Sequence, residues 1–309
     1  MAGNIFEVLI VGGGPAGLTA GLYSSRAGLT SALIEKGILG GQIVNAEVVE
    51  NFPGFPQGIS GMELGVKMHE QAQKYGLKTI FAEVHGLEIQ GTLKVLKTTE
   101  GNFNAKTVIL AGGAVRRKLG IEGEDKLTGR GVSYCAVCDG AFFQDQTIAV
   151  IGGGDTAVTE ALHLTRFASK ITIVHRRDQL RAGHILQEKI RYEPKINFLW
   201  NTTVSAVKGT DVVETIELLN TKTGLISSLE VNGVFISVGT DPDTRYLKGI
   251  IPLDESGYII TNENMETQIP GVLAAGDVRH NSARQAITAA GDGATAAIYA
   301  QKYLTESIV

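Results

Sequence analysis

The sequence predicts an α/β fold in which one strand–turn–helix–strand unit occurs twice. A glycine-rich hexapeptide follows a short apolar run at residues 12–17, and a second one follows another apolar run at residues 152–157. Short apolar runs bounded by turn residues are typical of buried parallel strands. A helical pattern and a second apolar run come after each hexapeptide at matching offsets, which indicates an internal repeat.

The first hexapeptide has the glycines of a nucleotide-binding turn. It follows the predicted strand at residues 6–11. Gly12 allows a tight turn, Gly14 lets the backbone approach a pyrophosphate, and Gly17 allows close packing of a helix on a strand. The free N–H groups at the start of the following helix attract phosphate.

The helix after this turn is predicted to begin at Pro15 and to stop at Gly28. The next strand, residues 31–35, ends on Glu35, at the offset where a carboxylate binds a ribose diol. Strand, glycines, helix, strand and acid in this order predict a dinucleotide site. A glycine-rich turn in an ordinary α/β unit is the alternative.

The second repeat differs from the first at one telling position. Its strands are predicted at residues 147–151 and 170–174, and His175 stands where Glu35 stood. Arg176, Arg177 and Arg181 follow. A carboxylate repels a ribose 2′-phosphate, whereas guanidinium groups bind one through charge-assisted hydrogen bonds. The first site therefore suits a plain ribose, as in FAD, and the second suits NADPH; a solvated basic surface or a nucleic-acid contact are the alternatives.

Between the repeats stands Cys135-Ala136-Val137-Cys138-Asp139, which holds both cysteines of the chain. A Cys-x-x-Cys motif lowers a thiol pKa, so that one thiolate attacks a partner disulfide and the other resolves the mixed disulfide. A carboxyl at Asp139 suits the proton transfer that this chemistry requires. The alternatives are half of a zinc site, a structural disulfide and two inert buried thiols. The six scattered histidines do not complete a zinc site, and nothing marks the chain as secreted.

Composition narrows the classes of function further. The formal net charge is −4 with no basic run, which argues against nucleic acid as the main partner. The first residues lack a basic and apolar leader, and no apolar run reaches the ~18 residues of a membrane span. We therefore expect a cytoplasmic protein with no membrane and no metal, in which a cysteine pair is catalytic.

The remaining segments are predicted from their local patterns. Residues 40–42 and 50–55 are expected to be loops, and residues 116–131 and 240–242 to connect domains. The other expected elements are a helix at 62–75, a hairpin at 87–99, strands at 107–111, 233–239 and 272–277, and a last helix from about Arg284 to Tyr303.

Taken together, the order of motifs resembles the bacterial low-molecular-weight thioredoxin reductases over essentially the whole chain. The motifs are a glycine fingerprint, Cys-Ala-Val-Cys-Asp, a second fingerprint with His-Arg-Arg-x-x-x-Arg, and Gly-Asp-Val with Arg-Gln-Ala. The resemblance implies two Rossmann-like dinucleotide-binding domains, with the NADPH domain inserted into a discontinuous FAD domain. The FAD domain would comprise residues 1–115 and 243–309, and the NADPH domain residues 116–242.

The resemblance also implies residue roles. Cys138 would lie against the flavin, Cys135 would attack thioredoxin, and Asp139 would protonate the departing thiolate. The implied FAD contacts are Gly12, Gly14, Ala16, Glu35, Gly40, Gly41, Gln42, Asn51, Gly112, Gly276, Asp277, Arg284, Gln285 and Ala286. The implied NADPH contacts are Gly152, Gly154, Asp155, Thr156, His175, Arg176, Arg177 and Arg181.

The resemblance adds one role that the local pattern does not suggest, and the sequence departs from the family at one position. Phe142 and Phe143 match an aromatic pair that helps to dock thioredoxin, whereas the pattern alone would place both in the core. Gly112 stands where Thr is common in the family.

The implied activity is thioredoxin-disulfide reduction. Electrons would pass from NADPH to FAD, to the Cys135–Cys138 disulfide and to thioredoxin, in a homodimer whose domains rotate during turnover. Alkyl hydroperoxide reductase flavoproteins carry an N-terminal extension, ferredoxin–NADP reductases lack the cysteine pair, and glutathione-reductase-like enzymes place theirs beside the first fingerprint. A redox-sensing FAD- and NADPH-binding protein without turnover is the alternative from another class.

Overall fold

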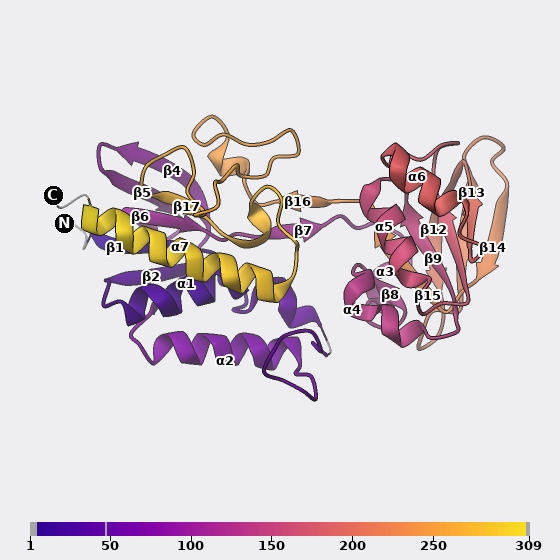
Figure 1. The fold of residues 1–309 in the computed structure, drawn as a ribbon, viewed down its shortest axis with the longest axis horizontal. Helices are drawn as coiled ribbons and strands as arrows, with labels where there is room; N and C mark the ends of the chain where they lie inside the picture. The colour runs from indigo at the N-terminus through magenta and orange to yellow at the C-terminus, as the bar shows by residue number, and fades with distance from the viewer. Residues whose placement is uncertain (1–4, 47, 307–309) are drawn as a thin grey trace. The chain divides into compact units, whose positions relative to one another are not determined.

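The computed structural model describes residues 5–46 and 48–306, and the chain forms two compact units (Figure 1). The first unit comprises the chain up to Val115 together with the segment from Asp241 onward, and the second comprises Arg116–Thr240. The sequence placed the second boundary slightly later, after residue 242. The ends of the predicted first and last segments, residues 1–4 and 307–309, lie outside the described residues.

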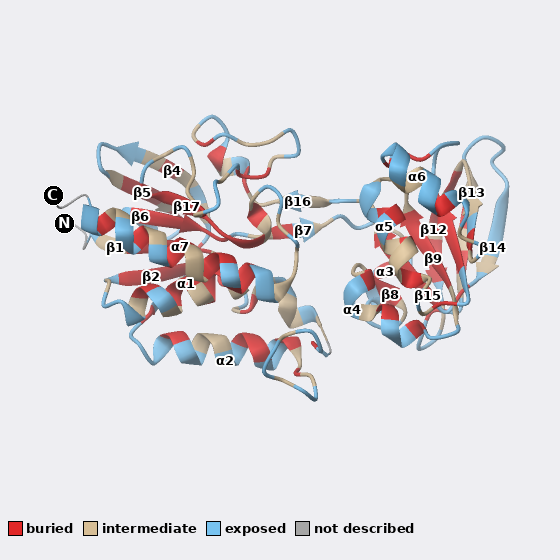
Figure 2. Cartoon of the chain, in the orientation of Figure 1, coloured by how far each residue is buried: buried red, intermediate tan, exposed pale blue. Residues whose placement is uncertain are grey.

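A seven-stranded sheet forms the centre of the first unit, in the order β3-β2-β1-β6-β5-β4 with β17 beside β6. The strands are β1 Phe6–Val11, β2 Ser31–Glu35, β3 Lys78–Phe81, β4 Val84–Gln90, β5 Leu93–Thr98, β6 Gly101–Leu110 and β17 Val272–Ala274. Strand β1 pairs in parallel with β2 and β6, while β4, β5 and β6 are antiparallel. The parallel strands β1, β2 and β17 are largely buried, as their apolar runs predicted, whereas the edge strand β3 is partly exposed (Figure 2).

Helices cover this sheet and bring the two segments of the unit together. They are α1 Pro15–Arg26, α2 Gly61–Gln73 and α7 Ala286–Glu306, with short 3₁₀ turns η1 Gly41–Asn45, η3 Arg245–Leu247 and η4 Gly276–Val278. Helix α7 packs directly on α1. A Cβ at Gly293 of α7 would lie 2.0 Å from the carbonyl oxygen of Ala16, so only glycine permits this close approach. The C-terminal segment is thereby held against the first glycine turn.

The second unit repeats the first on a smaller scale. Its parallel sheet has the order β11-β10-β9-β15-β8, so the strand before the glycine turn again lies between two parallel neighbours. The bounds are β8 Val132–Ser133, β9 Thr147–Gly152, β10 Lys170–Val174, β11 Ile196–Leu199 and β15 Gly233–Ser237. A three-stranded antiparallel sheet follows, with β12 Thr202–Lys208, β13 Thr215–Asn220 and β14 Ile226–Glu230. The helices are α3 Glu124–Leu127, α4 Ala136–Asp139, α5 Asp155–Leu164 and α6 His184–Arg191, and η2 is Gly140–Phe143.

The chain passes between the units twice, through strands that pair with each other. These are β7 Ala114–Arg116 and β16 Thr240–Pro242. The predicted connector at residues 240–242 coincides with β16. Of the predicted connector at residues 116–131, only Arg116 belongs to β7, and the rest lies in the second unit, where it holds the short helix α3. The sequence patterns did not single out α6 or β3, which are too short for a clear apolar period.

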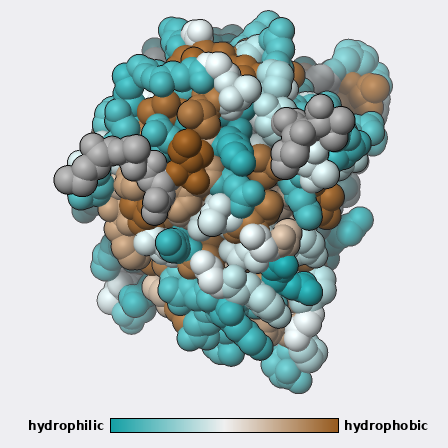
Figure 3. Space-filling model, turned by 90° about the vertical axis from the view of Figure 1, so that its left-hand side faces the viewer, coloured by the Kyte–Doolittle hydropathy of each residue, from teal (hydrophilic) through white to brown (hydrophobic). Residues whose placement is uncertain are grey.

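The surface of the described residues mixes polar and apolar side chains. On the face shown in Figure 3, hydrophobic residues lie in groups among hydrophilic ones, as is usual for protein surfaces. None of the helices in the described part of the chain has the length and apolar character needed to cross a membrane.

Candidate active site

The first glycine turn is built so that backbone alone lines it. Gly12 has φ +104°, and a Cβ there would lie 2.3 Å from the carbonyl oxygen of Ala111. A Cβ at Gly17 would lie 1.8 Å from the carbonyl oxygen of Gly12. Gly14 caps α1 without a side-chain hydrogen bond, which leaves the first amides of the helix for a ligand.

Glu35 lies directly over this turn. Its Oε2 accepts a hydrogen bond from Gly13 N at 2.5 Å, and its Oε1 accepts one from Gly37 N at 2.7 Å. These two bonds fix the carboxylate at the end of β2, beside the phosphate-binding turn. The same turn is approached by the loop before η1, because Gly40 N donates to Gly13 O at 2.8 Å.

The C-terminal segment brings a second group of predicted residues to the same turn. A Cβ at Gly276 would lie 2.9 Å from the Cβ of Ala16, so η4 and its Asp277 lie against the start of α1. Ser282 Oγ donates to Asp277 Oδ1 at 2.8 Å and accepts from Arg284 N at 3.1 Å. Sequence reasoning missed Ser282, which links two of the predicted cofactor contacts.

Asn51 and Gln285, far apart in sequence, meet side chain to side chain. Asn51 Nδ2 donates to Gln285 Oε1 at 3.2 Å, which joins the 50–55 loop to the start of α7 at Ala286. The remaining predicted contacts of this group, Gly41, Gln42 and Gly112, lie in the first unit with at least part of their surface accessible. The residues predicted to hold FAD thus come from five separate stretches of the first unit, at residues 12–16, 35–42, 51, 112 and 276–286.

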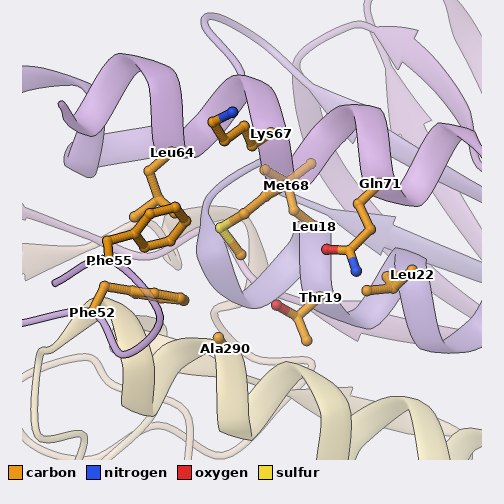
Figure 4. A pocket seen from close by; sticks show the side chains of 10 residues that line it. All are labelled: Leu18, Thr19, Leu22, Phe52, Phe55, Leu64, Lys67, Met68, Gln71 and Ala290. Carbon is orange, nitrogen blue, oxygen red and sulfur yellow. The ribbon is translucent and has the colours of Figure 1, made fainter. Parts of the chain in front are cut away.

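An apolar cavity of about 290 Å³ adjoins the loop that carries Asn51 (Figure 4). Phe52 and Phe55 line one side, with Leu64 of α2 beside Phe55. The other lining residues are Lys67, Met68 and Gln71 of α2, Leu18, Thr19 and Leu22 of α1, and Ala290 of α7. The cavity lies within the first unit, between helices α1, α2 and α7 and the loop that carries the predicted flavin contact Asn51.

The second glycine turn repeats the first, with a different side chain over it. Gly154 caps α5 without a side-chain hydrogen bond, as Gly14 caps α1. The ring of His175 occupies the space over Gly153, where a Cβ would lie 2.3 Å from Nδ1. Burial lowers the pKa of His175, and the neighbouring Arg181, Arg177 and Arg176 lower it further, so the ring is neutral at pH 7.

The arginines of this turn are exposed, unlike the histidine. Arg176 and Arg177 follow β10, and Arg181 N donates to Gly153 O at 2.7 Å. Asp155, which was predicted to contact the nucleotide, accepts from Gly183 N at 2.7 Å and holds the loop in place. Thr156 is exposed on the first turn of α5. The cluster therefore places exposed positive charge beside a glycine turn whose neighbouring loop is held by hydrogen bonds.

The two cysteines form a disulfide at the start of α4. Cys135 caps this four-residue helix, and its Sγ accepts a hydrogen bond from Cys138 N at 3.2 Å. Cys135 is half-buried and Cys138 is exposed. This hydrogen bond holds Cys135 Sγ at the N-terminus of the short helix.

Asp139 completes this helix in a partly buried setting. Its N–H donates to Cys135 O at 3.1 Å, and its Oδ2 accepts from Ser133 Oγ at 2.5 Å. Burial raises the pKa of Asp139 above its usual range, while the Ser133 hydrogen bond and the charge of Arg116 act against that rise. A carboxyl with a raised pKa holds its proton closer to neutral pH, as a general acid requires.

The aromatic pair after the disulfide divides between surface and core. Phe142 is exposed, whereas Phe143 is buried and its ring meets that of Phe235 edge to face at 5.2 Å between centroids. The expectation that both rings face a partner is therefore wrong for Phe143, because its ring fills the space beside Gly233.

Two polar residues next to the disulfide were not singled out from the sequence. Ser133 contacts Asp139, and Tyr134 OH donates to the buried Glu124 at 2.6 Å. Glu124 in turn accepts hydrogen bonds from Leu119 N and Gly120 N at 2.9 and 2.7 Å. Through Glu124, the segment at residues 119–120 is therefore linked to Tyr134, the residue before Cys135. No local pattern signals these contacts; only their adjacency to Cys135 could have drawn attention to them.

The residues present fit both predicted nucleotides. The first turn has open helix amides and a fixed carboxylate, which suit a pyrophosphate with an unphosphorylated ribose. The second has open helix amides, exposed guanidinium groups and a buried His175 Nε2 with no hydrogen-bond partner. Among the described residues, no group of three or more His, Cys, Asp or Glu is arranged to hold a metal ion.

Comparison with known proteins gives consistent matches over nearly the whole chain. A family described as pyridine nucleotide-disulphide oxidoreductase matches residues 6–293. The chain is 48% identical over 304 residues to a thioredoxin reductase of Bacillus subtilis (strain 168), covering 98% of this chain and 96% of the relative. A thioredoxin reductase of Peptoclostridium acidaminophilum is 45% identical over 307 residues, covering 97% and 98%.

Two solved structures are similar in sequence but superpose differently. The thioredoxin reductase of Streptococcus pyogenes MGAS5005 is 47% identical, covers 98% of this chain and 99% of its own, and has a TM-score of 0.93. That of Lactococcus lactis in its FR conformation is 46% identical, covers 97% and 99%, and has a TM-score of 0.67.

Proposed function

Because the chain belongs to the pyridine nucleotide-disulphide oxidoreductase family, we propose that it is an NADPH-dependent thioredoxin-disulfide reductase. The observation that carries this proposal is the Cys135–Cys138 disulfide. It lies in the same unit as the second glycine turn, which has three exposed arginines beside it. Thioredoxin reductases from several organisms share nearly half of their residues with this chain over its full length.

The two nucleotides are assigned to the two turns. FAD is held by the first turn, Glu35 and the C-terminal segment around Asp277, and NADPH by the second turn with Arg176 and Arg177. Bound FAD supplies a carrier that passes two electrons from NADPH to the disulfide. The protein's own contribution is to bind both nucleotides and to present the sulfurs.

The dithiol then reduces the partner in two exchanges. The thiolate of Cys135 attacks one sulfur of the thioredoxin disulfide, and that S–S bond breaks as a mixed disulfide forms. The second thioredoxin sulfur leaves as a thiolate and takes a proton. Cys138 then attacks Cys135 Sγ, which restores the internal disulfide and releases thioredoxin with two electrons and two protons gained. Asp139 supplies a proton to a departing thiolate.

Turnover requires the two units to change their arrangement. The predicted NADPH turn and the disulfide both belong to the second unit, whereas the predicted flavin contacts belong to the first. Nicotinamide and disulfide must each reach the flavin, and the disulfide must also reach a protein. Rotation about the paired connectors β7 and β16 alternates these contacts.

We further propose that the protein is a cytoplasmic homodimer. A reducing compartment keeps the dithiol available for exchange, and the formal charge of −4 suits a freely diffusing protein. Sedimentation equilibrium of the holoenzyme tests the dimer: a mass corresponding to one chain contradicts it.

The activity is tested by a thioredoxin-coupled assay that compares NADPH, NADH and reduced ferredoxin as donors. We expect turnover with NADPH and little with the other two. In Cys138→Ser, Cys135 can still attack, but no second enzyme thiol completes the exchange, and the mixed disulfide can only revert through the other thioredoxin thiol. Thioredoxin reduction should therefore be lost, and the mixed disulfide, trapped by rapid alkylation of that free thiol, should be seen by mass spectrometry. In Cys135→Ser that species should be absent. Failure of the wild type to reduce thioredoxin would overturn the proposal.

A further inference from the structure

Ser133 occupies a buried position beside the redox helix. It is the last residue of β8, where it pairs with Phe235 of β15, and only 5% of its surface is exposed. Cys135 follows two residues later. A buried hydroxyl must find hydrogen-bond partners within the protein, because leaving it unpaired is costly.

Those partners are two groups of the reaction machinery. Ser133 Oγ lies 2.5 Å from Asp139 Oδ2 and accepts from Cys135 N at 3.1 Å. Cys135 O is at 3.5 Å, the outer limit of a hydrogen bond. A hydroxyl has a single proton to donate, so this proton goes to the carboxylate of Asp139.

We propose that Ser133 is a positioning residue, which holds the carboxyl of Asp139 beside the Cys135–Cys138 disulfide and joins it to the backbone of Cys135. This inference rests on the proposed function, in which Asp139 is the acid that protonates a thiolate. The hydroxyl fixes one carboxylate oxygen and leaves the other oxygen of Asp139 to carry the transferred proton.

The same hydrogen bond sets the pH range in which the acid works. Burial raises the pKa of Asp139, and the Ser133 hydroxyl and the charge of Arg116 at the end of β7 lower it. The hydroxyl stabilises the ionised carboxyl, so its removal favours the protonated form. Without Ser133 the carboxyl therefore keeps its proton to higher pH but is no longer held in one orientation.

The test is a titration of the oxidised holoenzyme, in which the bonded cysteines do not titrate. With ¹³C-labelled aspartate, Asp139 is assigned by its absence in Asp139→Asn and is followed by NMR against pH. In Ser133→Ala we expect its pKa to rise by about one unit, since a hydrogen bond to a charged group contributes on this scale. The alkaline limb of the pH–kcat profile should move in the same direction while kcat falls, and Ser133→Thr should restore both.

Ser205→Ala is the matched control. Ser205 Oγ donates to Glu217 Oε1 at 2.7 Å, the same pairing of hydroxyl and carboxylate in the same unit but on the β12–β13 sheet. Its replacement should change neither the Asp139 titration nor the pH profile. Ser133→Gly provides a second hydroxyl-free variant if Ser133→Ala does not fold.

An unchanged Asp139 pKa and pH profile in the hydroxyl-free variants overturns the inference. A double-mutant cycle can also overturn it. If Ser133→Ala lowers kcat by the same factor in the Asp139→Asn variant as in the wild type, Ser133 acts independently of the carboxyl. If the wild type does not reduce thioredoxin at all, the proposed function fails, and the NMR titration still decides whether Ser133 controls Asp139.

Discussion

At the scale of single residues, His175 and the arginines beside it have different tasks. The histidine is buried over Gly153, and its lowered pKa keeps it neutral at pH 7, so it shapes the turn and contributes no charge. Arg176 and Arg177 are exposed and permanently charged. In the proposed function, the guanidinium groups are therefore the groups expected to recognise a 2′-phosphate.

Replacing Arg176 or Arg177 by Ala should weaken NADPH binding with little effect on NADH. Loss of a charge-assisted bond to a phosphate is expected to raise the dissociation constant for NADPH about 10- to 100-fold. Isothermal titration with both nucleotides measures this. Lys222→Ala is the control, since Lys222 is a nearby exposed cation paired with Asp178 at 3.1 Å. Equal losses for NADPH and NADH would refute the phosphate assignment.

Asp139→Asn should lower activity without lowering stability. Loss of a general acid costs about 100-fold or more in kcat. Because burial raises the pKa of Asp139 in the folded protein, the folded state binds this proton more tightly than the unfolded chain does. The ionised carboxyl therefore costs stability above the unfolded pKa of about 3.9, and the full cost is reached above the folded pKa.

In thermal unfolding at pH 7, Asp139→Asn should accordingly melt at the same temperature as the wild type or higher. This advantage should shrink as the pH falls towards the unfolded pKa. A clear drop in melting temperature at pH 7 would show that the carboxylate stabilises the fold, contrary to this account.

At the scale of elements, helix α7 is anchored to the segment around Asp277 by a largely buried ion pair. Arg279 donates from Nε to Asp292 Oδ2 at 2.6 Å and from Nη2 to Oδ1 at 3.0 Å. Asp292 Oδ2 also accepts from Gly276 N at 3.1 Å, next to Asp277. The pair joins the middle of α7 to both ends of the η4 turn.

Asp292→Ala should loosen this turn. Removing one partner of a buried ion pair leaves the other charge uncompensated, at a cost of about 3 kcal/mol in unfolding free energy. Urea unfolding of the holoenzyme measures the loss, and flavin fluorescence should show faster release of FAD. Glu306→Ala in the same helix removes an exposed pair with Lys302 and should cost about 0.5 kcal/mol or less. Equal losses in both variants would contradict the anchoring role.

The sequence could predict features that depend on neighbouring residues, but not contacts between side chains that only folding brings together. The strands before each glycine turn, the turns and Glu35 follow from local patterns, because each signal lies within a few neighbouring residues. Arg279 with Asp292, Ser133 with Asp139, and the burial of Phe143 depend on side-chain contacts that only the folded chain creates. No apolar period distinguishes Phe143 from the exposed Phe142 beside it.

At the scale of the whole molecule, the chain order separates the chemistry into two units. The second unit carries both the predicted NADPH turn and the disulfide, while the first carries the predicted flavin contacts. In the proposed mechanism, the nicotinamide and the disulfide therefore belong to the same unit, and both must reach the flavin. The two short connectors β7 and β16 pair with each other, which allows one unit to move as a body.

A covalent link between the units should therefore stop turnover. A photocleavable lysine-directed cross-linker avoids the redox cysteines, and products joined between residues 1–115 or 241–309 and residues 116–240 are identified by peptide mapping. Such species should retain at most one half-reaction: flavin reduction by NADPH or thioredoxin reduction by the pre-reduced enzyme, each followed by stopped flow. Cleavage by light should restore multiple turnover, and products linked within one unit should stay active throughout. Full turnover in a species linked between the units would mean that a single arrangement serves the donor, the disulfide and the protein partner, and the rotation would have to be abandoned.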